Sequence, residues 1–200
     1  MLITISGHSG VGKSTTAERL AKKLRAKVVD TGNFFRDQAK KRGLNVVEFG
    51  RYVEKHPEVD RRLDDDMLAL AAKTPRLILL GRLTGWITYR RQVPAIRIWM
   101  SATPKIRAQR VIKREGGDYA TVYKDLMTRD RDNIRRYRQL YGLDLNDLGI
   151  YDIVCPTDNL NLNQVVALLF REVSKLWLKK RQKRLSRPPR KAPRRRKPKA

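Results

Sequence analysis

Short apolar runs alternate with longer segments of helical periodicity along most of this 200-residue chain. The runs are brief and rich in Val, Ile and Leu, which favours buried strands. They predict strands at residues 2–6, 27–30, 76–80, 95–100 and 150–155. Apolar residues spaced three and four apart predict helices from the glycine-rich segment to residue 24, over 33–73 with breaks near Gly43 and at Pro57, and over 104–115, 119–141 and 162–178. Strands that alternate with helices predict an α/β fold with a five-stranded parallel sheet flanked by helices.

The segment between the first strand and the first helix, GHSGVGKS at residues 7–14, matches the pattern G-x-x-x-x-G-K-[ST] in full. Its glycines let backbone N–H groups approach a triphosphate closely, and the helix that follows points its partial positive charge at the phosphates. The pattern predicts that Lys13 reaches the β- and γ-phosphates and that the Ser14 hydroxyl binds Mg²⁺. His8 occupies a variable position of the motif and is given no chemical role. We expect this P-loop to bind a nucleoside triphosphate through Gly7, His8, Ser9, Gly10, Val11, Gly12, Lys13, Ser14 and Thr15.

Two arginines follow predicted strands at the same edge of the sheet. Arg36 lies in the first turn of the helix after the second strand, and Arg82 comes directly after the third strand. Ligands bind at the carboxyl ends of parallel strands, where the P-loop also lies. Two guanidinium groups that converge there would hold a second phosphate, although they would also suit a carboxylate. The alternative is that both are ordinary surface residues of a basic protein.

Further arginines flank Gly116-Gly117, a pair that resembles the hinge of a mobile lid. Closure of such a lid would bring guanidinium groups to the equatorial oxygens of a transferring phosphoryl group. A solvated helix face explains the same spacing, so both interpretations stay open. The arginines concerned are Arg110, Arg114, Arg129, Arg131, Arg135 and Arg136.

Taken together, the motifs along residues 1–175 resemble an archaeal-type cytidylate kinase, a member of the nucleoside monophosphate kinases. The motifs are the P-loop, DTGNFFR, GLNVVEF, HPEVDRRLD, GRLTGW, REGG, RRYRQLYGLDLND and YDIVCPTDN. The resemblance implies transfer of the γ-phosphoryl group of ATP to CMP or dCMP, giving the diphosphate and ADP. It also implies a kinase domain at residues 1–178, with a helical monophosphate-binding part at 33–73 and a small lid at 114–131.

The resemblance also carries functional residues over to this chain. Either Asp132 with Arg135 or Asn133 with Arg136 matches an acidic-then-arginine pair of the family, and residues 157–159 match a loop near the adenine of ATP. We expect the monophosphate to be bound by Asp30, Thr31, Arg36, Arg82 and Asp132. We expect catalysis to involve Lys13, Arg82, Arg129, Arg135 and Arg136.

The chain departs from the family pattern at three positions. Leu80 stands where a carboxylate that orders the water shell of Mg²⁺ is common, so Ser14 and the phosphates must hold the metal, with Asp30 helping through water. Asn133 replaces a frequent acidic residue. Leu83 stands where bacterial members often have an aspartate that recognises the base. The residue that recognises cytosine, and the preference among CMP, dCMP and UMP, are therefore not identified by the sequence.

Charge is distributed unevenly along the chain. Of the formal net charge of +26, 14 positive charges and no negative charge lie from Lys175 onward. The proline-rich residues 179–200 predict a disordered tail, because they cannot bury enough apolar surface to offset the entropy of ordering. Such tails bind polyanions with little sequence preference, which suggests RNA or ribosome contact. A merely solubilising tail and a membrane-surface tail are the alternatives.

The remaining features suggest a cytoplasmic enzyme. The single cysteine, Cys155, cannot form an intrachain disulfide and is expected to be buried at the end of a strand. No apolar run is long enough to cross a bilayer, no signal peptide is recognised, and a monomer is the expected state. Two alternatives to cytidylate kinase activity remain, a P-loop kinase for another small acceptor such as AMP and an RNA- or ribosome-binding ATPase.

Overall fold

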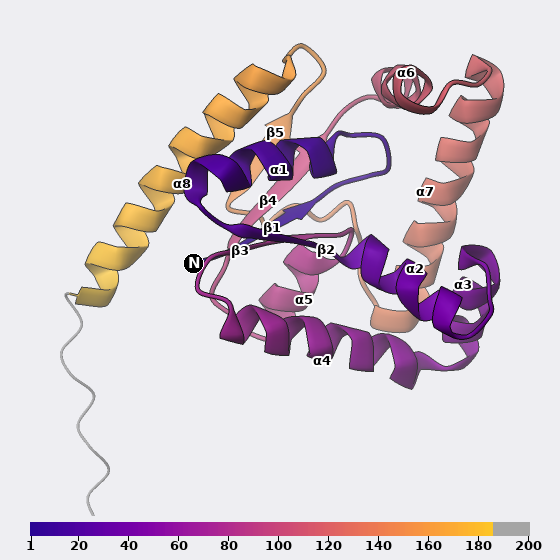
Figure 1. Ribbon diagram of the computed structural model, residues 1–200, viewed down its shortest axis with the longest axis horizontal. Coiled ribbons are helices and arrows are strands. Elements are labelled where there is room, and N and C mark those ends of the chain that lie inside the picture. The colour runs from indigo at the N-terminus through magenta and orange to yellow at the C-terminus, as the bar shows by residue number, and fades with distance from the viewer. Residues whose placement is uncertain (186–200) are drawn as a thin grey trace, which may run out of the picture.

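A single parallel sheet of five strands forms the centre of the computed structural model (Figure 1), which describes residues 1–185 apart from the side chains of 46, 47, 60 and 183–185. The strand order is β2-β3-β1-β4-β5, and every neighbouring pair is parallel. This confirms the predicted fold class. The strands are β1 (Leu2–Ser6), β2 (Lys27–Asp30), β3 (Leu77–Leu80), β4 (Ile96–Ser101) and β5 (Ile153–Pro156).

Helices cover both faces of this sheet. Figure 1 shows α1 and α8 together on one side, α4 and α5 on the other, and the α6–α7 pair at one end. Each crossover returns the chain to the same edge, so the carboxyl ends of the strands and the loops after them lie together. The helices are α1 (Lys13–Leu24), α2 (Thr31–Lys41), α3 (Val46–Lys55), α4 (Pro57–Lys73), α5 (Thr84–Arg90), α6 (Pro104–Glu115), α7 (Tyr119–Tyr141) and α8 (Leu162–Leu185).

The buried apolar side chains form three separate clusters. The main core joins the sheet to α1 and α8 and includes the predicted buried cysteine, Cys155. A second cluster joins α5 to the end of α7 around Trp86 and Tyr137. The third lies within α2, α3 and α4 around Phe49 and Val53, so this helical insertion has a small core of its own.

Helix α5 was not predicted. Its sequence, TGWITYR, consists mainly of β-branched and aromatic residues with low helix propensity. Packing stabilises it instead, because Trp86 and Thr88 are buried and a Cβ on Gly85 would lie 2.5 Å from the ring of Tyr151. Tertiary contacts therefore override local preference here.

The prediction of disorder from Lys179 is wrong for residues 179–185, which continue α8. These residues are mostly Lys, Arg, Gln and Leu, all good helix formers, so a helix that is already packed extends into them. Lys180 also anchors the extension, because its ammonium donates to the carbonyl oxygen of Ala95 (2.8 Å) and pairs with Asp152 (3.2 Å). The rest of the predicted tail, 186–200, lies outside the described residues.

Candidate active site

The P-loop takes a backbone conformation that favours glycine at three positions. Gly7, Gly10 and Gly12 have φ angles of 146°, 80° and 95°. A Cβ on Gly7 would overlap the carbonyl oxygen of Met100 at the end of β4, and one on Gly10 would lie 3.0 Å from the carbonyl oxygen of Arg107 on α6. Glycine is needed here because the loop packs directly against two backbone segments.

Lys13 lies against the loop that precedes it. Its ammonium donates to the carbonyl oxygens of Gly7 (2.7 Å) and His8 (2.8 Å). Burial, followed by the nearby guanidinium of Arg82, lowers the pKa of Lys13 to about 7, although Asp30 and then Asp130 oppose the shift. A phosphate placed at this position would stabilise the protonated amine, so the local electrostatics favour an anion.

The ends of β2 and β3 meet beside the P-loop. Arg82 donates from Nη2 to the hydroxyl of Ser9 at 2.6 Å, which places its guanidinium on the loop. Gly81 has no room for a side chain because Oγ1 of Thr31 occupies that space. Asp30 caps α2 by accepting from the amide of Gly32 at 2.8 Å. The structure thus gathers Thr31 and Arg82 next to the predicted triphosphate site.

Arg36 lies in the second turn of α2, because the helix begins at Thr31, two residues earlier than predicted, and its side chain is exposed. Its guanidinium donates to the side-chain oxygen of Asn33, and Nη1 would be 3.4 Å from a Cβ on Gly32. Within residues 1–185, no hydrogen bond or ion pair of Arg36 reaches the P-loop or Arg82. Of the two arginines predicted to bind a second phosphate, Arg82 therefore contacts the P-loop, whereas Arg36 contacts its own helix.

A buried charged cluster that the sequence did not reveal joins the P-loop to α6 and α7. Arg107 and Asp130 pair at 2.7 Å and are only 3% and 5% exposed. Arg107 also donates to the carbonyl oxygen of Ser9 at 3.1 Å. The other carboxylate oxygen of Asp130 lies 3.3 Å from Nδ1 of His8, in an alignment too poor for a hydrogen bond, and the His8 ring meets the ring of Trp99 edge to face. His8, although at a variable position of the motif, thus takes part in holding the loop.

Electrostatics agree with this arrangement. Burial raises the pKa of Asp130, but contacts with His8 and Arg107 outweigh it and leave the pKa below its usual range. A sequence signal for this cluster existed, because Asp130 stands in line with buried Leu126 and Tyr137 on α7. A charged residue within an apolar stripe indicates a buried partner.

The predicted lid arginines divide into exposed residues and one that faces the insertion. Arg129 is exposed, and Arg135 pairs loosely with exposed Asp132 at 3.4 Å. Arg136, by contrast, lies with its guanidinium 5.3 Å from the centre of the Phe35 ring on α2. Arg136 thus reaches from α7 to the helical insertion, and the choice between Asp132 with Arg135 and Asn133 with Arg136 stays a prediction.

The loop after β5 is tied to the P-loop by Arg110. Its guanidinium donates to the carbonyl oxygen of Val11 (3.1 Å) and to both the hydroxyl and the carbonyl oxygen of Thr157 (2.8 and 2.6 Å). The remaining arginines of the predicted group, Arg114 and Arg131, are exposed, and Arg114 pairs with its neighbour Glu115. Arg110 therefore holds two loops of the nucleotide side together.

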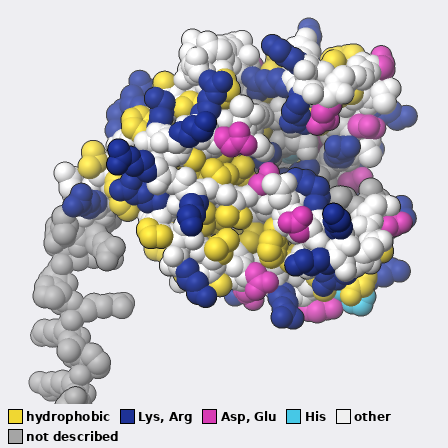
Figure 2. Space-filling model, in the orientation of Figure 1, with side chains coloured by type: hydrophobic (Ala, Val, Ile, Leu, Met, Phe, Trp, Pro, Cys, Tyr) yellow, Lys and Arg dark blue, Asp and Glu magenta, His cyan; other side chains and the backbone are white. Residues whose placement is uncertain are grey.

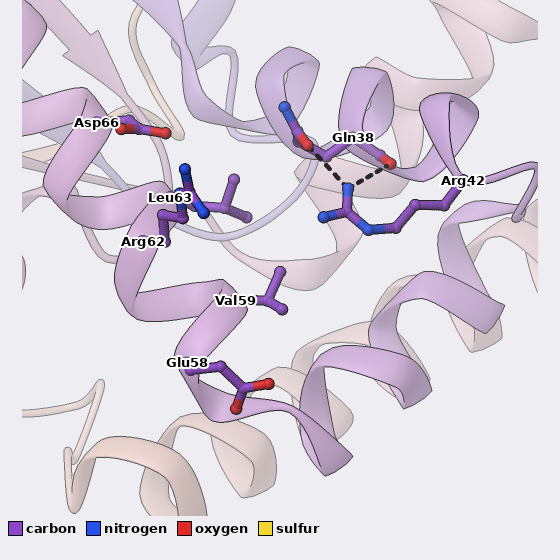
Figure 3. Close-up of a pocket in the computed structure, with 7 residues that line it drawn as sticks. All are labelled: Gln38, Arg42, Glu58, Val59, Arg62, Leu63 and Asp66. Atoms are coloured by element: carbon purple, nitrogen blue, oxygen red, sulfur yellow. Dashed lines mark hydrogen bonds between the residues drawn. The ribbon is translucent and has the colours of Figure 1, made fainter.

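A pocket of about 320 Å³ lies elsewhere, between α2 and α4 (Figure 3). In it the guanidinium of Arg42 turns toward Gln38, donating to its backbone and side-chain oxygens at 3.2 and 2.8 Å. Arg62 shares the lining of this pocket with the acidic residues Glu58 and Asp66. None of the predicted site residues lines this pocket, so it is separate from the phosphate site.

Comparison with known proteins identifies the family of the chain. The profile of the cytidylate kinase-like family matches residues 2–159. The cytidylate kinase of Pyrococcus abyssi is 37% identical over 179 residues, covering 90% of this chain and 97% of that protein. That of Archaeoglobus fulgidus is 34% identical over 183 residues, covering 92% and 100%. A shikimate kinase structure from Bacteroides thetaiotaomicron shares the fold, with a TM-score of 0.56, 14% identity and coverage of 89% and 98%. The resemblance drawn from the motifs is confirmed, and the chain belongs to the cytidylate kinase-like family.

Proposed function

We propose that this chain transfers the γ-phosphoryl group of ATP to CMP or dCMP, giving CDP or dCDP and ADP. The observation that carries the proposal is the meeting of Lys13 and Arg82 on one P-loop, in a chain of the cytidylate kinase-like family. The loop amides and Lys13 bind the triphosphate, and Arg82 lies where the acceptor phosphate would approach it. The relatives in Pyrococcus abyssi and Archaeoglobus fulgidus are named for the same activity.

The transfer needs positioning and charge stabilisation rather than a general base, because a phosphate dianion is already an adequate nucleophile. In this proposal the monophosphate is bound by Asp30, Thr31, Arg36, Arg82 and Asp132. Lys13, Arg82 and the lid arginines Arg129, Arg135 and Arg136 stabilise charge on the transferring group. Of these three, Arg136 is supported most directly, since it already contacts the insertion.

The divalent metal that a kinase of this family requires is Mg²⁺ in this proposal. The donor set fits an ion held mainly by substrate phosphates, because Ser14 presents an exposed hydroxyl at the start of α1 while Leu80 is buried and offers no oxygen. Among residues 1–185 no group of three acidic, His or Cys side chains is placed to hold a metal alone. When bound, Mg²⁺ neutralises charge on the β- and γ-phosphates.

Domain closure completes the proposed site. We assign the kinase domain to 1–178, the monophosphate-binding part to 33–73 and the lid to 114–131. Support comes from the separate core of α2, α3 and α4 and from the turn at Gly116-Gly117, both with positive φ, that joins α6 to α7. Movement of these parts brings Arg36 toward Arg82 and excludes water, which would otherwise hydrolyse ATP.

A nucleotide panel tests the proposal. The purified chain is incubated with ATP and Mg²⁺ and with each of CMP, dCMP, UMP and AMP in turn, and ADP and diphosphate products are measured. Rapid formation of CDP or dCDP is the expected result. Turnover only with AMP would assign another acceptor, and hydrolysis stimulated only by RNA would assign an ATPase. Either outcome would replace the proposed activity.

We further propose RNA or ribosome contact through the basic tail, with a cytoplasmic monomer as the working state. The support is the run of 14 Lys and Arg residues from Lys175 onward without an acidic residue. None of the helices within residues 1–185 is both long and apolar enough to cross a membrane. Electrophoretic mobility shifts at increasing salt test the contact, because binding by counterion release must weaken steeply.

A further inference from the structure

The face formed by α1 and α8 is strongly basic and belongs to no part of the proposed site. Figure 2 shows Lys and Arg side chains gathered over these two helices. Arg19, Lys22 and Lys23 of α1 line a groove of about 380 Å³ whose other wall is α8. This groove lies along the C-terminal half of α1, away from its P-loop end.

The charge of this groove is not compensated. Within the part of the chain that the structure describes, none of its three cations forms an ion pair. Arg19 donates to the side-chain oxygen of Asn163 at 2.6 Å, and the ammonium of Lys23 lies 5.7 Å from the centre of the Phe170 ring. Neutral partners therefore hold the groove together and leave its positive potential available to a polyanion.

Helix α8 carries an exposed aromatic stripe that continues the groove. The adjoining face of the helix is buried in the main core through Val165, Leu169 and Val173. Phe170 and Trp177 on the outer face remain 36% and 41% exposed. Residues three and four apart lie on the same face of a helix. By this spacing, one stripe of α8 contains Asn163, Val166, Ala167, Phe170, Ser174, Trp177 and Arg181.

We propose that the α1–α8 face binds single-stranded nucleic acid. Phosphates lie along Arg19, Lys22 and Lys23, and an unpaired base stacks on Trp177. Uncompensated cations beside exposed aromatic side chains are the combination that single strands require, since their bases present free faces. The inference extends the proposed tail contact to a folded surface, but it rests on residues of α1 and α8 alone.

Two other occupants fit less well. A second copy of the chain would have to approach against a net charge of +26, which opposes association. An anionic membrane would take up a broad apolar helix face, whereas one face of α8 is already buried and, among its described side chains, the exposed large apolar ones are Phe170, Trp177 and Leu178. Charge complementarity and separate aromatic side chains favour a nucleic acid strand.

Tryptophan fluorescence provides a direct test. Of the three tryptophans, Trp86 and Trp99 are 7% and 4% exposed, so Trp177 dominates any change caused by a surface ligand. The full chain is titrated with oligoadenylate and oligodeoxyadenylate of about 15 nucleotides, the two arms separating RNA from DNA. We expect binding to quench the fluorescence of the unmodified chain. The affinities of variants that lack Trp177 are measured by the anisotropy of a labelled oligonucleotide. Trp177→Phe should bind with near-normal affinity, and Trp177→Ala should bind about fivefold or more weakly.

A matched pair of variants tests the cations. The triple variant Arg19→Ala/Lys22→Ala/Lys23→Ala should weaken binding about tenfold or more and reduce the salt slope by about two. Lys40→Ala/Lys41→Ala/Lys55→Ala removes the same charge from exposed positions on α2 and α3 and should change affinity about twofold or less. Kinase turnover of the groove variant should match that of the unmodified chain.

The outcomes separate this inference from the earlier proposals. Binding without a change in Trp177 fluorescence, with equal affinities of the two triple variants, would overturn the inference and leave the tail as the contact. No binding by the full chain would overturn both nucleic acid proposals without touching the kinase activity. Tighter binding to phosphatidylserine vesicles than to either oligonucleotide would assign a membrane, and concentration-dependent dimerisation that shields Trp177 from acrylamide would assign a second copy.

Discussion

The triphosphate side of the site is held by buried, interlocked charges, whereas the monophosphate side presents exposed side chains on separate helices. At the P-loop, Arg82 and Arg107 both donate hydrogen bonds to Ser9. Arg107 also forms an ion pair with Asp130. On the other side, Arg36 folds onto its own helix and Arg135 pairs with a neighbouring surface carboxylate. In the proposed mechanism, the contrast corresponds to a preorganised ATP side and an acceptor side that is completed by closure.

Removing the central cation of the preorganised side should have the largest effect. Lys13→Ala is expected to lower turnover roughly 10³-fold or more, similar to the loss of other charge-stabilising groups. Steady-state assays with saturating ATP and CMP measure it, and circular dichroism checks that the fold is kept. Turnover like that of the unmodified chain would contradict the assigned role.

The buried pair should matter for stability far more than the exposed pair. Asp130→Ala leaves the guanidinium of Arg107 buried without its partner, and we expect a loss of about 3 kcal/mol or more in the free energy of unfolding. Asp132→Ala, which removes the exposed 3.4 Å pair on the same helix, should cost about 0.5 kcal/mol or less. Urea denaturation measures the free energy of unfolding of both variants. Equal losses in Asp130→Ala and Asp132→Ala would show that the buried pair is no more important for stability than the exposed pair.

The two arginines that are proposed to bind the acceptor phosphate, Arg36 and Arg82, should differ in their kinetic effects. Arg82→Ala should reduce kcat about 10²-fold, because the group lies at the P-loop where transition-state charge develops. Arg36→Ala should chiefly raise the KM for CMP, by about tenfold, because it binds the acceptor similarly before and during transfer. If Arg36→Ala instead lowered kcat and Arg82→Ala chiefly raised the KM for CMP, then Arg36, not Arg82, would face the transferring group.

The pKa of Lys13 yields a pH dependence for ATP binding. With a pKa of about 7 in the free chain, the amine is charged below that pH and largely neutral above it. Bound phosphates favour the charged form, so the affinity for ATP should fall as pH rises above 7, by up to about tenfold per pH unit.

Calorimetry at pH 8 in two buffers of different ionisation enthalpy should therefore detect the uptake of close to one proton on ATP binding. Lys13→Arg supplies the control, since its guanidinium stays charged and should abolish the uptake. Equal apparent enthalpies for the unmodified chain in both buffers would show that Lys13 is already protonated before ATP binds.

Local sequence was sufficient for the features that depend on local chemistry. The P-loop, the five strands and the position of Arg82 follow from motif spacing and apolar periodicity, and the structure agrees with the strands to within three residues. Helix α5 was missed because burial, not propensity, stabilises it. The Arg107–Asp130 pair was missed because its members lie on different helices, and only packing brings them together. The choice between Arg135 and Arg136 likewise depends on which side of α7 faces the insertion.

Helix α7 is also a spacer of fixed length. Asp130 contacts the P-loop cluster and Arg136 contacts the insertion, so six residues of one continuous helix set both the distance and the angle between them. Each residue advances a helix by about 100° around its axis. A single inserted or deleted residue between these two positions would swing Arg136 away from Phe35 while Asp130 stayed in place. The number of residues between Asp130 and Arg136 therefore cannot change without uncoupling the P-loop cluster from the helical insertion.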